Sequence, residues 1–140
     1  MRSKCVQFFN SVAASEYHFI AVTETWITPD ISSSELFPAN FVIYRQDRNL
    51  DSLNITRGGG VLLAVDSLYN SVRIDLSSIT ILVPSIDIVG VKITGKSKFL
   101  MFVIYIPPTI AFDDFYLFFE SFMNLNIIQN DKLIILGDFN

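Results

Sequence analysis

Polar side chains stand directly after three apolar runs of this sequence. Glu24 follows "IAVT", Tyr105 ends "FLMFVIY", and Asp138 and Asn140 follow "LIILG". In α/β enzymes, active sites gather where the strands of a sheet deliver such groups to one edge. Two carboxylates, an amide and a phenol suit magnesium, which prefers oxygen ligands and is often held by one or two carboxylates plus a substrate phosphate. These residue types therefore predict a site for a hard cation.

Composition limits the class of protein. The 140 residues are 51% hydrophobic with a mean hydropathy of +0.44, which suits one domain with a buried core. The longest apolar stretch, 99–106, is far below the roughly 18 residues of a membrane-spanning helix, so we expect no membrane partner. A net charge of −4 argues against a simple nucleic-acid-binding module, since phosphate affinity normally shows as a basic patch. An enzyme that reaches phosphate through a bound cation tolerates this balance.

The single cysteine and the single histidine exclude two further kinds of site. Cys5 has no second cysteine in the chain, so we expect no disulfide partner, and one cysteine fits a reducing compartment. Zinc sites usually take three or four Cys or His ligands, which this sequence does not offer. We interpret Cys5 and His18 as structural or incidental.

Hydrophobic periodicity predicts an alternation of helix, strand and loop in the first half of the chain. Val6, Phe9, Val12 and Ala13 recur at helical spacing and predict a helix. Three glycines, 58–60, introduce a strand, and no lysine follows them as in a P-loop. The predicted elements are a helix at 4–16, strands at 19–23, 41–45 and 61–65, and polar loops at 28–40 and 47–60.

The second half of the chain is predicted to contain a sheet and a long helix. Segment 71–94 favours two or three strands, and 99–106 is apolar on both faces, as expected of a central strand ended by two prolines. Segment 112–128 is predicted to be an amphipathic helix, followed by a doubly buried strand at 132–140. This order favours a layered α/β or α+β architecture. The expected core face of the helix is Phe112, Phe115, Phe119, Phe122 and Met123.

Five motifs in this order resemble a known family. "TETW" after an apolar strand, "RGGGVLLAV", "YIPP", the helix "DDFYLFFESF" and "ILGDFN" look like the endonuclease domain of insect non-LTR retrotransposons, part of a reverse transcriptase polyprotein. That domain belongs to the endonuclease/exonuclease/phosphatase superfamily. The resemblance covers nearly the whole chain. It implies a DNase-I-like fold, which is a four-layer α/β sandwich.

The resemblance also implies a role for each polar residue at the strand ends. Glu24 matches the acidic metal ligand, and the metal would be Mg²⁺ or Mn²⁺. Tyr105 matches a tyrosine near the scissile phosphate, where a phenol can hydrogen-bond oxygens as charge develops. Asp138 matches the aspartate that orients and deprotonates the attacking water, and Asn140 matches an amide that contacts the phosphate and fixes that aspartate. Together they imply metal-assisted nicking of target DNA, in the nucleus for the parent element.

Two features of the family do not occur in this sequence. The family begins with a strand that bears a metal-side asparagine, upstream of the segment that matches "RSK". It also has a late Ser-Asp-His motif beyond "GDFN", and His18 precedes Glu24 and cannot be that histidine. We therefore expect residues 1–140 to be a partial, incomplete domain, truncated at both ends, without robust nicking activity. Uncovered sheet would then favour non-specific self-association.

Other interpretations compete with the endonuclease. The chain could be a non-catalytic remnant of a mobile element, or another phosphodiesterase or phosphatase of the superfamily, although "SSELFP" and "YRQDRN" argue against the latter. Asp138 and Asn140 are common turn formers, and Tyr105 could simply be a core residue. Arg45, Arg48 and Arg57 could touch a DNA backbone, but a solvated loop is the default expectation for all three.

Overall fold

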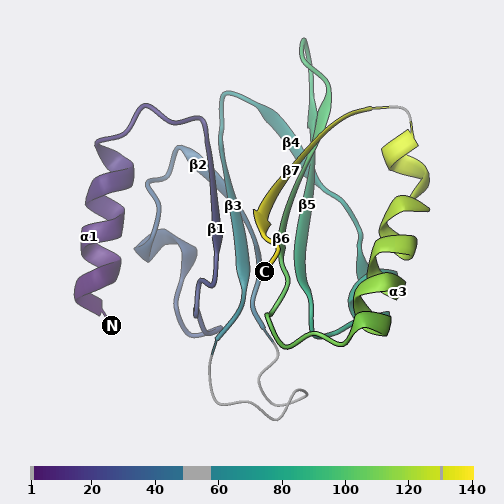
Figure 1. Ribbon diagram of the computed structural model, residues 1–140. Coiled ribbons are helices and arrows are strands. Elements are labelled where there is room, and N and C mark those ends of the chain that lie inside the picture. The colour runs from purple at the N-terminus through teal and green to yellow at the C-terminus, as the bar shows by residue number, and fades with distance from the viewer. Residues whose placement is uncertain (1, 49–57, 130) are drawn as a thin grey trace.

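The computed structural model describes residues 2–48, 58–129 and 131–140 and has mixed α/β content (Figure 1). Within these residues there are three α-helices, two short 3-10 helices and two sheets. The helices are α1 (Arg2–Ala13), α2 (Ser77–Leu82) and α3 (Phe112–Met123), with 3-10 turns at Ser33–Glu35 and Asn126–Gln129. The strands are β1 (Phe19–Thr23), β2 (Phe41–Gln46), β3 (Val61–Asp66), β4 (Asn70–Arg73), β5 (Asp87–Thr94), β6 (Phe99–Tyr105) and β7 (Lys132–Asp138).

The strands form one three-stranded and one four-stranded sheet. The first sheet is antiparallel with the order β1-β3-β2. The second has the order β4-β5-β6-β7 and is antiparallel except between β6 and β7. A parallel pair needs a crossover connection, and α3 supplies it. The expected central strand at 99–106 is confirmed, because β6 lies between β5 and β7.

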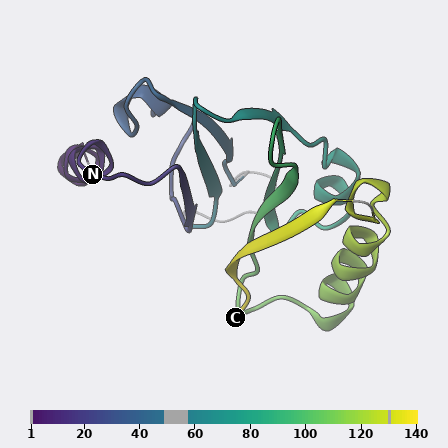
Figure 2. The same ribbon diagram turned by 90° about the horizontal axis from the view of Figure 1, so that it is seen from above.

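The elements stack as helix, sheet, sheet and helix (Figures 1 and 2). Alternate residues of β3 explain how: Val61, Leu63 and Val65 face the second sheet, while Leu62 and Ala64 pack with α1. On the far side, residues of β5 and β6 pack against α2 and α3. Strands covered on both faces read as continuous apolar runs, which is why these segments could be predicted. The expected layered architecture is confirmed at this level.

The segment 71–94 contains one element that the sequence analysis missed. Two strands are present, as expected, but "SSITIL" between them forms α2. The Asp75 carboxylate accepts a hydrogen bond from the Ser77 N–H at 3.0 Å, a local turn that leads the chain into the helix. Ile79 and Val83 are buried in the core beside α3. Burial thus outweighs the modest helix propensity of β-branched residues in this segment.

The buried face of α3 differs from the expected one. Phe118 and Phe122 are buried, whereas four of the five expected core residues are exposed, with Phe112 at 77%. Phenylalanines occur around much of this helix, so two stripes at intervals of three and four are possible, and periodicity alone does not select between them. Phe122 packs edge-on against Phe102 of β6, with ring centroids 5.0 Å apart. The exposed residues are Phe112, Phe115, Phe119 and Met123.

The helix expected at 4–16 is confirmed as α1, whereas the last strand departs from expectation. On α1, Val12 is buried but Val6 is 60% exposed, and Cys5 and Phe8 pack instead against the first sheet. The prediction of a doubly buried final strand is wrong, because most of β7 is exposed. β7 lies at the edge of its sheet. Its apolar composition shows that it could be buried, but burial also needs another element packed over it, which the composition does not reveal. No helix in the described ranges is long and apolar enough to cross a membrane.

Phe102 should contribute strongly to stability. Its ring is fully buried, and it covers Gly90 on the neighbouring strand, where a Cβ would lie 2.6 Å from the ring. We expect Phe102→Ala to lower the free energy of unfolding by about 3–5 kcal/mol. Urea unfolding, followed through the fluorescence of the single tryptophan, measures this. Phe112→Ala is the matched control and should change stability by less than about 0.5 kcal/mol; equal losses would contradict the packing of α3.

Candidate functional site

One edge of the structure collects the polar residues from both sheets. Asp87, Tyr105 and Asp138 are register partners across β5, β6 and β7. Glu24 follows β1 in the other sheet, and its carboxylate accepts a hydrogen bond from the Tyr105 hydroxyl. Glu24, Tyr105 and Asp138 are therefore brought to the same edge, and Asn140 follows Asp138 there. The contact between Glu24 and Tyr105 joins the two sheets at this point.

The chain around Glu24 adopts an unusual backbone conformation. Glu24 and Trp26 have φ values of 50° and 51°, in the left-handed region that residues with side chains rarely adopt. The Thr25 N–H donates to the Gly60 carbonyl at 3.2 Å, and the Trp26 N–H donates to the Gly59 carbonyl at 3.0 Å. These bonds hold the turn against the glycine segment. Such strain concentrates at functional sites, where the surrounding structure sustains it.

Tyr105 is a buried hydrogen-bond donor at this edge. Burial, with smaller contributions from the Glu24 hydrogen bond and charge, raises the pKa of Tyr105 to about 12. Asp138 raises this pKa further, while the positive charge of Arg48 opposes the shift. The phenol is thus protonated at neutral pH and can donate. Asp138 is the register partner of Tyr105 on the neighbouring strand.

Arg48 and Asp87 form a buried ion pair beside Tyr105. Arg48 Nη2 and Nε lie 2.6 Å and 2.9 Å from Asp87 Oδ2, and Nη2 also donates to the Ser85 carbonyl at 3.1 Å. The same Asp87 oxygen accepts the Gly60 N–H at 2.8 Å. Burial raises the pKa of Asp87, and Arg48 and Gly60 oppose that shift. The expectation that Arg48 lies in a solvated loop is therefore wrong.

Asp87 belongs to this site although it was not predicted from the sequence. The signal was present, since Asp87 is the one acidic residue within the largely apolar segment "SIDIVGVKIT". A charge at such a position is buried only when it is paired. Its partner, Arg48, lies 39 residues earlier, a separation that no local pattern reveals.

Asn140 occupies the edge but is directed at the backbone. Its Nδ2 donates to the Ile106 carbonyl at 3.0 Å, and its N–H donates to Asp138 Oδ1 at 3.3 Å. The Ile106 N–H in turn donates to the Asp138 carbonyl at 2.9 Å. Asn140 therefore fastens the end of β7 to the end of β6. This arrangement fits a residue that fixes Asp138.

The donor set would leave much of a cation's coordination to water and substrate. Among the described residues, no three His, Cys, Asp or Glu side chains gather into a cluster that could hold a metal ion. Glu24 accepts the Tyr105 hydroxyl, and Asp138 pairs with Tyr105 in the register of β6 and β7, so both carboxylates lie at the end of the sheet where the phenol is. Mg²⁺ is commonly held by one or two carboxylates plus substrate phosphate. The residues present fit that arrangement and do not form an all-protein cage.

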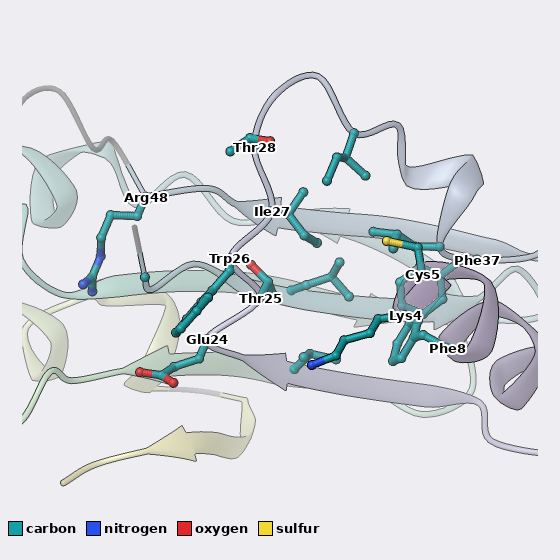
Figure 3. A pocket seen from close by; sticks show the side chains of 15 residues that line it. Lys4, Cys5, Phe8, Glu24, Thr25, Trp26, Ile27, Thr28, Phe37 and Arg48 are labelled. Atoms are coloured by element: carbon teal, nitrogen blue, oxygen red, sulfur yellow. The ribbon is translucent and has the colours of Figure 1, made fainter. Parts of the chain in front are cut away.

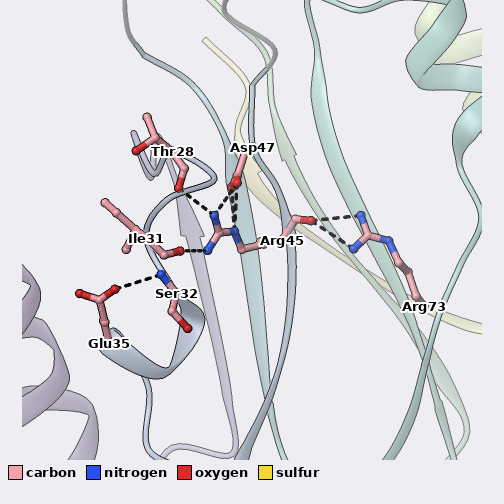
Figure 4. A network of polar contacts seen from close by, with 7 residues as sticks. All are labelled: Thr28, Ile31, Ser32, Glu35, Arg45, Asp47 and Arg73. Carbon is pink, nitrogen blue, oxygen red and sulfur yellow. Dashed lines mark hydrogen bonds and ion pairs between the residues drawn. The ribbon is translucent and has the colours of Figure 1, made fainter.

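Arg45 holds the loop that follows the site (Figure 4). Its guanidinium donates to the Ile31 carbonyl at 2.7 Å and to the Thr28 carbonyl at 3.1 Å, and Nε donates to Asp47 at 2.9 Å. Arg73 donates to the Arg45 carbonyl at 3.1 Å. These partners assign Arg45 a structural role in place of the expected solvated loop. Arg57, the third arginine considered, lies outside the described residues.

A cavity of about 700 Å³ opens beside Glu24 (Figure 3). Glu24, Trp26 and Arg48 lie at one end of it, and Phe8 and Phe37 lie at the other. Its walls come from α1, from β1 with the following loop, and from β3. The polar edge described above thus adjoins a largely apolar recess.

Comparison with known proteins gives no match: the chain matches no protein-family model, no curated protein and no solved structure. The resemblance to retrotransposon endonucleases stays a prediction.

Replacing Tyr105 should change how stability depends on pH. Below its ordinary pKa of 10.0 the phenol is protonated in both the folded and the unfolded chain. As pH rises from 10.0 to about 12, the unfolded chain releases this proton while the folded chain keeps it, so the free energy of unfolding falls. Tyr105→Phe removes this contribution, and we expect a smaller fall across this window.

Urea unfolding at several pH values, followed through the fluorescence of Trp26, measures the difference. Tyr116→Phe, at an exposed position on α3, is the matched control. If both variants flatten the pH dependence equally, the effect does not arise at Tyr105.

Proposed function

We propose that Glu24, Tyr105 and Asp138 belong to the site of a metal-dependent phosphodiesterase, specifically the endonuclease domain that the motifs resemble. The observation that carries this proposal is the hydrogen bond from the Tyr105 hydroxyl to Glu24. It joins two residues 81 positions apart at the end of the sheet where Asp138 also lies. Active sites of layered α/β enzymes are assembled at such edges from separate strands.

The layers support the same proposal. A DNase-I-like fold is a sandwich of two sheets with helices on both outer faces, and the order of layers here is compatible with it. In the proposed fold, the polar edge lies where the two sheets meet. The site would thus draw residues from both sheets, as the contact of β1 with β6 through Glu24 and Tyr105 does.

Each residue has a distinct part in the proposed reaction. Asp138 is exposed at the end of β7 and accepts the proton of the attacking water, which needs a carboxylate within hydrogen-bond reach. Tyr105 stays protonated at neutral pH, and when substrate binds its one O–H would turn from Glu24 to a phosphate oxygen as negative charge develops. Asn140 holds Asp138 through its backbone N–H.

Glu24 would hold a divalent cation such as Mg²⁺ or Mn²⁺, and the negative charge of Asp138 at the same edge would favour its binding without being a ligand. When bound, such an ion supplies positive charge at the phosphate oxygens. It would also offset the acidic balance of the chain near a DNA backbone. Glu24 accepts the Tyr105 hydroxyl, so the phenol is already oriented toward the carboxylate end of the site before substrate arrives.

Metal binding provides the direct test of the proposal. We expect the chain to bind Mn²⁺ in titration calorimetry, and Glu24→Gln or Asp138→Asn to weaken the Kd by at least about tenfold. Glu35→Gln is the matched control, because Glu35 caps a 3-10 turn through the Ser32 N–H. Affinities that are equal in all four proteins would contradict the proposed site. Absence of any binding would favour the non-catalytic alternative.

Nicking of plasmid DNA tests the reaction itself. We expect no robust nicking with Mg²⁺ beyond that of Asp138→Ala, since the sequence has no match for the first-strand asparagine or the Ser-Asp-His motif of the family. Loss of a single transition-state donor typically costs about 10²–10³ in rate. Metal-dependent nicking that Asp138→Ala abolishes would show that these 140 residues suffice. Hydrolysis of a phosphate monoester alone would instead favour a phosphatase.

A further inference from the structure

We propose that Arg48 and Asp87 are a positioning pair that fixes the placement of Glu24 and Tyr105 at the site. The chemical role of that placement rests on the proposed function, whereas the placement itself is a property of the fold. Neither residue is expected to touch the substrate. Both act through the two residues that they hold.

One arm of the pair acts on the backbone. Asp87 accepts the Gly60 N–H at 2.8 Å, and the Gly60 carbonyl accepts the Thr25 N–H at 3.2 Å. Thr25 is the residue after Glu24, whose φ of 50° is strained. The carboxylate on β5 therefore holds, through one glycine, the turn that presents Glu24.

The other arm acts on the aromatic ring. The Arg48 guanidinium carbon lies 5.1 Å from the centre of the Tyr105 ring, a cation–π distance. Asp87 holds that guanidinium on one side, and the Tyr105 hydroxyl reaches Glu24 on the other. Two chains of contacts therefore connect Asp87 to Glu24. One runs through Gly60 and Thr25, and the other runs through Arg48 and Tyr105.

The burial of the pair indicates that it orients its neighbours more than it stabilises the fold. The side chains of Arg48 and Asp87 are only 9% and 4% exposed. Apolar residues of similar volume often replace a buried ion pair without loss of stability, so such a pair is weak evidence for a stabilising role. A directional role is different, because apolar side chains cannot orient a backbone N–H or a guanidinium.

Gly59 makes room for the pair. A Cβ at this position would lie 2.2 Å from Arg48 Nε and 2.7 Å from Asp87 Oδ2. By contrast, a Cβ at Gly58 would meet no atom within 4 Å. Both glycines have positive φ, so a side chain is strained at either one, but only Gly59 abuts the ion pair. The central glycine of "GGG" is therefore required by the ion pair as well as by the turn.

Amide hydrogen exchange and Trp26 fluorescence test the proposal on the whole chain. In Arg48→Met and Asp87→Asn we expect the Thr25 and Trp26 amides to exchange at least about tenfold faster, with a shift in Trp26 emission. Amides in the interior of β5 should change much less. Arg73→Met is the matched control, since the Arg73 guanidinium donates to the Arg45 carbonyl and takes no part in the contacts between Asp87 and Glu24. Uniform acceleration of all amides, or no change at Thr25 and Trp26, would overturn the proposal.

A second pair of variants serves if the charge substitutions prevent folding. Gly59→Ala keeps both charges but displaces Arg48, and it should reproduce the local exchange at Thr25 and Trp26. Gly58→Ala carries comparable backbone strain and should not. Equal effects from the two glycine variants would contradict the positioning role.

Mn²⁺ titration separates this proposal from the proposed function. If the parent chain binds no metal but the local exchange appears in the variants, the phosphodiesterase proposal fails and the positioning pair stands. If the parent binds metal and Arg48→Met neither changes local exchange nor weakens the Kd, the pair has no positioning role. Loss of affinity together with local exchange supports both.

Discussion

The polar edge depends on a carboxylate that is almost entirely removed from water. Asp87 is 3% exposed, and a charge in such a position must find partners within the protein. Its partners are the Arg48 guanidinium and the Gly60 N–H, which come from the two ends of the connector before β3. Both partners lead to the same place, because Gly60 holds the turn after Glu24 and Arg48 covers the ring of Tyr105. The contacts that satisfy the buried Asp87 carboxylate therefore also assemble the site.

The packing of the two sheets makes this interaction possible. β3, β5 and β6 are buried on both faces, so their positions are fixed by contacts on two sides. Gly60, Asp87 and Tyr105 lie at the ends of these strands, so their positions are also well fixed. β7 is less constrained, since it pairs with β6 at the sheet edge and is largely exposed. Asn140 compensates locally by bonding the Ile106 carbonyl beside Asp138.

Much of the fold could be predicted from local patterns, and the exceptions share one cause. The buried strands were identified because continuous apolar runs bounded by turn residues leave few alternatives. Three features were not predicted: the buried face of α3, the short helix α2 and the exposure of β7. Each depends on which part of the protein packs against that element. Phe118 rather than Phe119 faces the sheet, although both are phenylalanines of the same helix. Composition cannot distinguish them.

For the site, the sequence by itself determined which residue types end the strands: Glu24, Tyr105 and Asp138 each follow or end an apolar run. Strand ends are local features, so their polar residues can be read without a structure. Only the tertiary structure decided that Tyr105 donates to Glu24 and that Asp87 pairs with Arg48. Those contacts join segments 81 and 39 residues apart, and they form because burial forces distant polar groups to satisfy one another.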